Sequence, residues 1–230
     1  MVDQRSHFHH ELETLEQMML DVADRAEQMV ESAVEALVTH DTALADEVVA
    51  QDDQIDHTHN EIHARWINLM ARQQPMGSDL RLMSAVLHLN MTLERTGDQC
   101  VNIAKLARLT ANLPSSDRIV AQIREMADLV RPMIRTAAQA FVRRDADEAR
   151  LLPAMDEPVD RINRSMYREV VACGPDPRLL EWATHMMMAA RALERIGDQA
   201  VDIGEQVVFL VTGEIHDFNE EAFAHRGDEE

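Results

Sequence analysis

Apolar residues recur at helical spacing along most of the chain. In the first segment they form one seam, made of Leu12, Leu15, Met19, Val22, Ala26, Met29, Ala33 and Ala36. A second segment begins near Thr42 and carries apolar residues seven apart, at Val48, Ile55, Ile62 and Leu69. A third begins at Asp79, after Pro75, Gly77 and Ser78. The pattern predicts three long helices in succession.

The second half of the chain repeats this plan. After Pro114-Ser115-Ser116, where Ser116 or Asp117 suits a helix N-cap, helical patterns run over 119–140, 152–166 and 193–210. A turn is predicted at Gly174-Pro175-Asp176-Pro177. A shift of 104 residues aligns Asp41, Asp52 and Asp56 with Asp145, Asp156 and Asp160, and a shift of 100 aligns 94–99 with 194–199.

The sequence therefore predicts an all-α fold of two tandem, internally duplicated three-helix bundles with six long helices. We expect the first repeat at residues 1–112, the second at 113–214, and an acidic flexible tail at 215–230.

Composition narrows the classes of function. The 230 residues include 42 Asp and Glu against 22 Lys and Arg, a net charge of -20, and only 3% are aromatic. Nucleic-acid binding needs a basic surface and usually stacking aromatics, so no nucleic-acid partner is expected. Seven glycines and seven prolines are too few for an all-β fold. A hydrophobic fraction of 46% can still bury a core.

Cysteine usage and the start of the chain bear on localisation. Cys100 and Cys173 allow at most one disulfide and lack zinc spacing, so we expect reduced, partly buried thiols. The first residues hold no apolar signal core, and no run of 18 apolar residues occurs. We therefore expect a soluble, cytoplasmic protein.

Each half carries two pairs of acidic residues four positions apart. Such residues share a helix face, where like charges cost about 0.2–0.5 kcal/mol and call for a compensating Arg, Lys or metal ion. Clustered hard oxygen ligands suit Mg, Mn, Ca or Fe better than copper or zinc. The candidate metal ligands are Asp52, Asp56, Glu94 and Asp98, then Asp156, Asp160, Glu194 and Asp198, with Asn102 and Asp202 as weaker candidates.

Ordinary surface charge is the competing interpretation. With Leu193 at a seam position, Glu194 and Asp198 fall on the outer face, so a metal site would be shallow and outside the core. Gly97 and Gly197 favour a metal site instead. Each lowers helix stability by about 0.5–1 kcal/mol relative to alanine, and its missing side chain lets a neighbouring helix or an ion approach the backbone.

Other chemistry is weaker. No Glu is followed three residues later by His, so a ferritin-like di-iron enzyme is not supported. No phosphate loop, nucleophile elbow or Cys/His pair is present, and we expect no enzyme. His59 is either a fifth ligand or a partly exposed polar residue, and Asn163 at the matching position favours the second. Met186-Met187-Met188 is interpreted as adaptable core packing rather than a partner groove.

The duplicated Glu-Arg-x-Gly-Asp of 94–98 and 194–198 resembles the PhoU family of phosphate-transport accessory proteins. The likeness covers about residues 8–214. It also includes the segments 101–104 and 201–204 that follow these motifs, Gln73-Gln74-Pro75 before 79–81, Asp52-Asp53-x-Ile55-Asp56, and the ending 211–214. The family often has His after Gly-Asp, where this chain has Gln99 and Gln199. The first half has Asn102 at the position where the second half has Asp202, so the two sites are expected to differ in charge.

The resemblance implies two similar three-helix bundles whose Glu/Asp-x-x-x-Asp motifs bind multinuclear metal clusters at the bundle surface. Iron is expected first, with manganese, magnesium or zinc as alternatives. It further implies a non-catalytic negative regulator that links the ATPase component of a phosphate ABC transporter to a sensor histidine kinase, as a homodimer that reaches membranes only through protein partners. The alternatives are a metal-storage or metal-sensing protein, or a metal-dependent binder of phosphate or polyphosphate.

Overall fold

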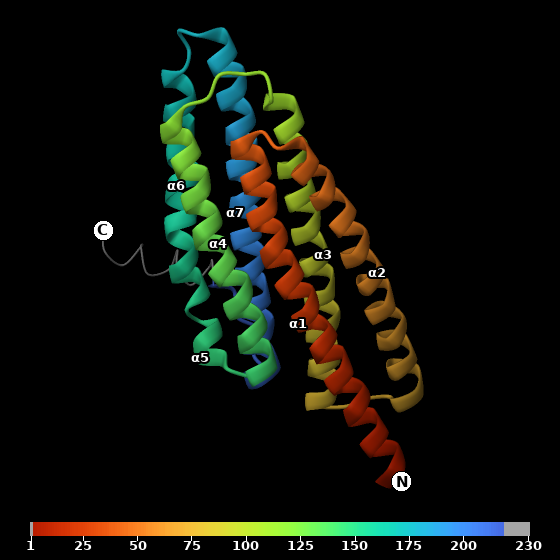
Figure 1. Ribbon diagram of the computed structural model, residues 1–230. Coiled ribbons are helices and arrows are strands. Elements are labelled where there is room, and N and C mark those ends of the chain that lie inside the picture. Colours follow the sequence, from red (N-terminus) through yellow and green to blue (C-terminus); the bar gives the residue numbers. More distant parts are fainter. Residues whose placement is uncertain (1, 219–230) are drawn as a thin grey trace, which may run out of the picture.

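The computed structural model describes residues 2–218, which contain six long helices, one short helix and no strand. Their bounds are α1 Val2–Thr39, α2 Thr42–Gln73, α3 Ser78–Thr110, α4 Asp117–Arg143, α5 Ala146–Ala149, α6 Leu152–Ala172 and α7 Pro177–Thr212. Figure 1 shows the long helices packed side by side, with α1, α2 and α3 in one group and α4, α6 and α7 in the other. The predicted all-α fold of two duplicated three-helix bundles is confirmed.

Matching residues cap the helical segment that follows the first helix of each repeat. Asp41 Oδ1 accepts the N–H groups of Ala43 and Leu44 at 3.0 Å, which satisfies two free donors of the first turn. Asp145 caps Asp147 and Glu148 in the same way. His40 and Arg144, directly before the two caps, both adopt a left-handed backbone with φ of 58°. The aligned Asp residues therefore perform the same local task in both repeats.

The second repeat departs from the first after its cap. Asp145 starts only the single turn of α5, and the chain bends before α6 begins at Leu152 with a proline in its first turn. Pro153 has no N–H to continue an earlier helix, which favours a new start at this point. The predicted cap at Ser116 is at the right position, but its side chain makes no capping hydrogen bond.

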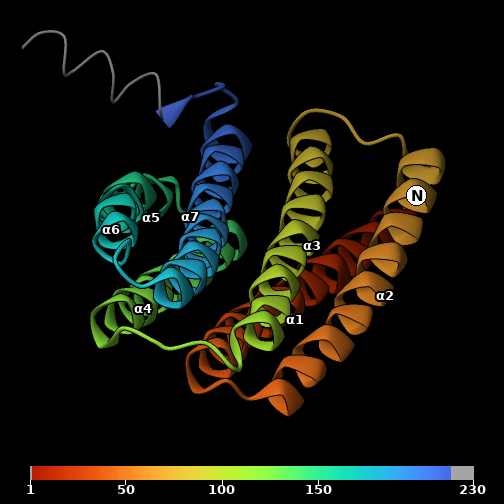
Figure 2. The ribbon, with the colours of Figure 1, turned by 90° about the horizontal axis from the view of Figure 1, so that it is seen from above.

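The two bundles pack along α3 with α7 and α1 with α4, as the view from above shows (Figure 2). Thr96 Oγ1 donates to Gln199 Oε1 at 2.9 Å, and Arg81 Nε donates to the Leu210 carbonyl at 3.2 Å, so α3 and α7 run antiparallel. The equivalent helices of the two repeats therefore meet at the centre of the molecule.

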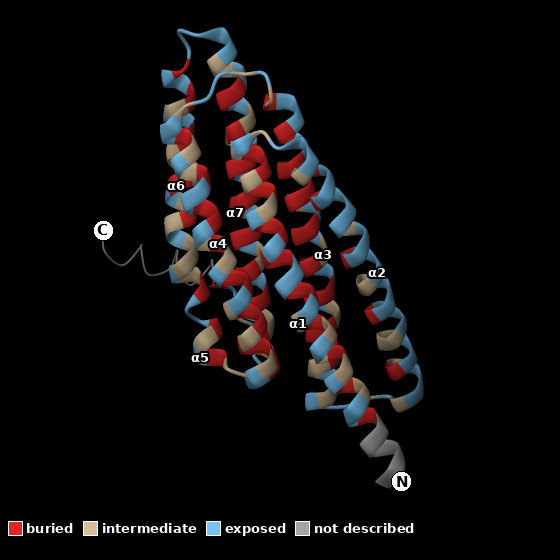
Figure 3. Ribbon diagram, in the orientation of Figure 1, coloured by how far each residue is buried: buried red, intermediate tan, exposed pale blue. Residues whose placement is uncertain are grey.

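Burial follows the predicted seams, with buried residues on the inward faces of the helices (Figure 3). Leu15, Ile55, Phe141 and Trp182 are among the large side chains that are almost completely enclosed. All buried apolar residues belong to one connected cluster that extends through both bundles. The predicted division at residues 112/113 remains a prediction, because the core is continuous across it.

Ion pairs between α1 and α4 compensate part of the acidic excess. The buried Glu27 pairs with both Arg131 and Arg135, and Arg124 Nη1 lies 2.6 Å from Glu35 Oε2. Since Glu27 is only 8% exposed, removing its partners would leave a desolvated carboxylate. The α1–α4 contact is therefore partly ionic.

The tail and cysteine predictions need correction. Phe218, placed by the prediction in the flexible tail, is buried, and its N–H donates to Glu205 Oε1 at 2.9 Å. Residues 219–230 of that predicted tail lie outside the described residues. Both cysteines are free, but they are buried rather than partly buried. Over residues 2–218, no helix combines the length and the hydropathy that crossing a bilayer requires.

Candidate metal-binding sites

An aspartate of one helix lies against the backbone of a glycine on the next. In the first half, a Cβ added to Gly97 of α3 would lie only 2.6 Å from Asp52 Oδ1 of α2. In the second half, a Cβ on Gly197 of α7 would overlap Asp156 Oδ1 of α6. No real Cβ tolerates such proximity, so both mid-helix glycines make room for a carboxylate, as the sequence analysis anticipated.

The acidic rows on neighbouring helices face each other. Burial raises the pKa of Asp52 to about 6, and repulsion from Asp56, Asp98 and Glu94 adds to the rise. Because Glu94 and Asp98 belong to α3, the carboxylates of both helices share one space. The pKa of Glu94 is raised as well, first by burial and then by Asp98. The first half thus places the four acids that the sequence singled out on facing sides of α2 and α3, within electrostatic reach of one another.

The second half repeats the arrangement with deeper burial. Burial raises the pKa of Asp156 to about 7, and repulsion from Asp160, Asp198 and Glu194 adds to the rise. Asp156 Oδ1 and Glu194 Oε2 are both buried without a hydrogen-bond partner. A buried polar atom without a partner costs about 1–3 kcal/mol, so these two oxygens favour a cation between them and the solvent.

Glu194 corrects the expectation of an outer-face site. Its side chain is only 6% exposed, whereas the heptad count placed it outside the core. The reason is that α7 packs against α3, α4 and α6 at once, so more than one face of this helix is covered. The count considered only one seam per helix and missed the second contact face.

Other candidate ligands lie nearer the solvent. Asp56, Asp98 and Asp198 are exposed, and so are the weaker candidates Asn102 and Asp202. Asp160 is half-buried, and its Oδ2 lies 2.9 Å from Arg164 Nη1. These acids form the open side of each site.

Two basic residues distinguish the second site from the first. Arg191 pairs with Glu194, and Arg164 pairs with Asp160. In the first half, no basic side chain of the described residues lies within ion-pair distance of Asp52, Asp56, Glu94 or Asp98. The sequence analysis missed Arg191 and Arg164, although i, i+3 and i, i+4 spacing to the acids could have indicated them.

His59 has a structural hydrogen bond. Its Nδ1 lies 3.2 Å from the Asn90 carbonyl oxygen, and Asn90 Nδ2 donates to the His59 carbonyl at 3.0 Å. The ring is half-buried between α2 and α3. This position agrees with the interpretation of His59 as a partly exposed polar residue.

A cation would suit these residues, but they are not gathered round one point. Within residues 2–218, no three His, Cys, Asp or Glu side chains form a ready metal-holding group. The donors are nonetheless hard oxygens, two of them buried without partners, and the glycines leave space beside the backbone. The residues present therefore fit a divalent or trivalent cation once the exposed acids turn inward.

Comparison with known proteins bears on both repeats. The family model described as "PhoU domain" matches residues 19–107 and 123–207. A Pseudomonas putida protein named "Phosphate-specific transport system accessory protein PhoU homolog" is 36% identical over 93% of this chain and 86% of its own length. A Rhizobium meliloti protein of the same name is 32% identical over 90% of this chain and 88% of its own.

Solved structures agree in fold. The crystal structure of PhoU from Pseudomonas aeruginosa superposes with a TM-score of 0.85 at 36% identity, covering 90% of this chain and all of that one. The phosphate transport system regulatory protein PhoU from Streptococcus pneumoniae gives a TM-score of 0.83 at 27% identity, over 91% and 99% of the two chains.

Proposed function

The chain belongs to the PhoU family, and from this premise we propose that it is a negative regulator of phosphate uptake and of phosphate-starvation signalling. Family membership carries this proposal, since full-length relatives are named accessory proteins of phosphate-specific transport systems. Deleting the gene is expected to derepress phosphate uptake in phosphate-rich medium. Unchanged uptake in such a strain would contradict the proposal.

We further propose that the protein acts as a cytoplasmic adaptor, as a homodimer, between the ATPase component of a phosphate ABC transporter and a sensor histidine kinase. Its net charge of -20 repels an anionic membrane surface, so recruitment is expected through protein contacts. A pull-down of the chain from cells grown in high and low phosphate, with partners identified by mass, tests this. Recovery of neither partner under either condition would refute the adaptor role.

The acidic sites are proposed to hold metal ions, with iron first and manganese, magnesium or zinc as alternatives. Asp52 and Asp156 would hold the ion beside the backbone of the glycines, and Glu94 and Glu194 would be the next ligands. Asp56 and Asp98, with Asp160 and Asp198 in the second half, would close the solvent side. When bound, the cations would neutralise carboxylates that otherwise repel one another. Each site would then clamp two helices of one bundle together.

Metal content of the purified protein tests the sites. Glu94→Ala with Asp98→Ala is expected to remove the ions of the first bundle only. The matched control is Glu125→Ala with Asp128→Ala, which removes two exposed acids of α4. Equal metal content in both variants would rule out the assignment.

The main alternative is metal storage or sensing, which the unpartnered oxygens of Asp156 and Glu194 would equally support. The two functions separate when all four acids are changed in one strain, by Glu94→Ala, Asp98→Ala, Glu194→Ala and Asp198→Ala. Regulation that is lost together with the metal supports a regulatory role. Regulation that persists without metal shows that the ions are structural or adventitious.

A further inference from the structure

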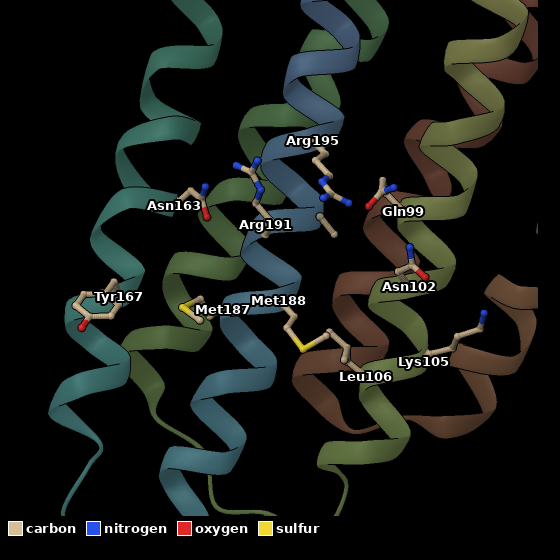
Figure 4. Close-up of a pocket in the computed structure, with 11 residues that line it drawn as sticks. Gln99, Asn102, Lys105, Leu106, Asn163, Tyr167, Met187, Met188, Arg191 and Arg195 are labelled. Carbon is tan, nitrogen blue, oxygen red and sulfur yellow. The ribbon is translucent and has the colours of Figure 1, made fainter.

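An open cavity of about 690 Å³ lies over α7, between α6 on one side and α3 on the other, next to the acidic rows (Figure 4). Arg195 extends from α7 toward Gln99 and Asn102 of α3, and Arg191 lies on the side of α7 that faces Asn163 of α6. The volume of the cavity is within the range of roughly 300–1,000 Å³ that is typical of ligand-binding cavities.

The charge of this cavity is opposite to that of the protein. Three cations line it, Lys105, Arg191 and Arg195, and none of the described residues that line it is Asp or Glu. Lys105 is the only lysine of the sequence. Arg191 is held by Glu194, so Lys105 and Arg195 are the cations open to a ligand. In a chain with a net charge of -20, such a cluster favours an anion.

The rest of the lining is apolar or carries amides. Met188 is 55% exposed and Tyr167 67% exposed, although large apolar side chains are usually covered. Met188 and Leu106 point toward each other across the gap between α7 and α3. The methionine triplet predicted as core packing is therefore divided, since Met186 is buried and Met188 opens into the cavity. A flat apolar group between α7 and α3 would cover Met188 and Leu106.

The duplication shows that the cationic character is not a consequence of the fold. At the matching positions of the other half, Lys105 corresponds to Glu205, Arg191 to Met91, and Asn102 to Asp202. Only Arg195 has a cationic counterpart, Arg95. Asp202 lies near Arg95 and His88, whose charges act on its carboxyl, so the matching residues do come together there. The same scaffold thus presents a mixed, acidic surface at one end and a cationic cavity at the other.

We propose that this cavity binds a nucleotide, with the phosphates on Lys105 and Arg195 and the base over Met188 and Leu106. Arg and Lys are the usual phosphate-binding side chains, and Gln99, Asn102 and Asn163 can each donate and accept hydrogen bonds at the edge of a base. The two phosphate contacts, Lys105 and Arg195, are not among the candidate metal ligands, so binding is expected in metal-free protein.

The single lysine gives a direct assay. Metal-free protein is treated with an amine-reactive reagent, and modification of Lys105 is followed by peptide mass spectrometry with ATP, ADP, adenosine, tripolyphosphate or no addition. ATP and ADP are expected to slow modification of Lys105 at least about fivefold, while adenosine and tripolyphosphate give much weaker protection. Arg195→Gln is expected to weaken ATP protection about tenfold or more, as for loss of a charge-assisted hydrogen bond.

Arg95→Gln is the matched control, since it removes the corresponding arginine of the other half and is expected to leave protection unchanged. Calorimetry with Lys105→Glu, which installs the residue type of position 205, should show the same loss as Arg195→Gln. Protection as strong by tripolyphosphate as by ATP would exclude a base site. Equal reactivity of Lys105 with and without nucleotide, or protection only by an acidic peptide, would overturn the proposal.

Discussion

Replacing Gly197 by alanine separates the ligand role of Asp156 from its structural cost. Gly197 lies inside α7, where alanine favours the helix by about 0.5–1 kcal/mol. The new Cβ would overlap Asp156 Oδ1, while the next neighbour, Met133 Cε, would lie at 3.7 Å, an ordinary contact. Only the Asp156 carboxylate therefore has to move, and rotation about its side-chain bonds turns it toward solvent.

That movement should stabilise the metal-free protein. The pKa of Asp156 is raised from 3.8 to about 7, and charging a fully buried carboxyl with such a shift would cost about 4 kcal/mol at pH 8. Because Asp156 is only partly buried, we expect about 1 kcal/mol instead. Together with the helix preference, Gly197→Ala should gain about 1–2 kcal/mol, or roughly 3–6 °C in Tm for a chain of this size.

The same variant should lose stabilisation by metal. Thermal unfolding at pH 8 is measured in chelator and with added Mn²⁺, since a ligand that binds only the folded state raises Tm by an amount that grows with the logarithm of its affinity. Gly97→Ala is the matched variant and should affect the first site alone. Asp156 is not the group displaced if metal-free Gly197→Ala is destabilised and adding Asp156→Ala does not restore its stability. Asp156 is not a metal ligand if the Tm of Gly197→Ala responds to Mn²⁺ as that of the unchanged protein does.

Three further predictions concern stability. In chelator, the free energy of unfolding should fall by about 1–3 kcal/mol between pH 5 and 8. The reason is that the raised pKa values of Asp52 and Asp156 stabilise the folded state fully below pH 4, and this stabilisation is lost as pH rises through 6 and 7. Urea unfolding of Asp52→Asn with Asp156→Asn should show a free energy that depends less on pH. Asp41→Ala should cost about 1 kcal/mol in urea unfolding through its lost cap, and the neighbouring exposed Thr42→Ala should cost less. Arg131→Ala with Arg135→Ala should lower the free energy of unfolding by leaving Glu27 unpaired, and Glu27→Gln should recover part of that loss in the same assay.

Periodicity and breakers predicted where α2 and α6 begin, but the last helix was expected from 193 and begins at Pro177. Asp41 and Asp176, which the sequence analysis did not name as caps, accept the first N–H groups of α2 and α7. The burial of Glu194 and of Phe218 could not be predicted, because both depend on contacts between helices distant in the sequence. Glu194 is enclosed by helices that the heptad count treated separately, and Phe218 packs against Gly204.

The acid–glycine contacts were within reach of the sequence, since the cost of a mid-helix glycine at matched positions demanded an explanation. What the sequence did not supply is the cavity beside α7. It depends on how α3 and α7 lie against each other, which places Arg195 near Gln99 and sets Thr96 against Gln199. Periodicity within single helices contains no information about that packing.

The difference between the two acidic sites predicts the order in which they take up cations. Arg191 neutralises Glu194 in the second site, whereas the residue that matches Arg191 in the first half is Met91. Four carboxylates without an ion-paired base attract a cation more strongly than four that share two arginines. In a stepwise Mn²⁺ titration, Glu94→Ala with Asp98→Ala should therefore remove the tighter phase, and Glu194→Ala with Asp198→Ala the weaker one. If the second site instead binds Mn²⁺ more tightly, the deeper burial of Asp156 has a larger effect on affinity than the neutralising charges of Arg191 and Arg164. In that case Arg191→Met, which introduces the residue type of position 91, should change the affinity of the second site little.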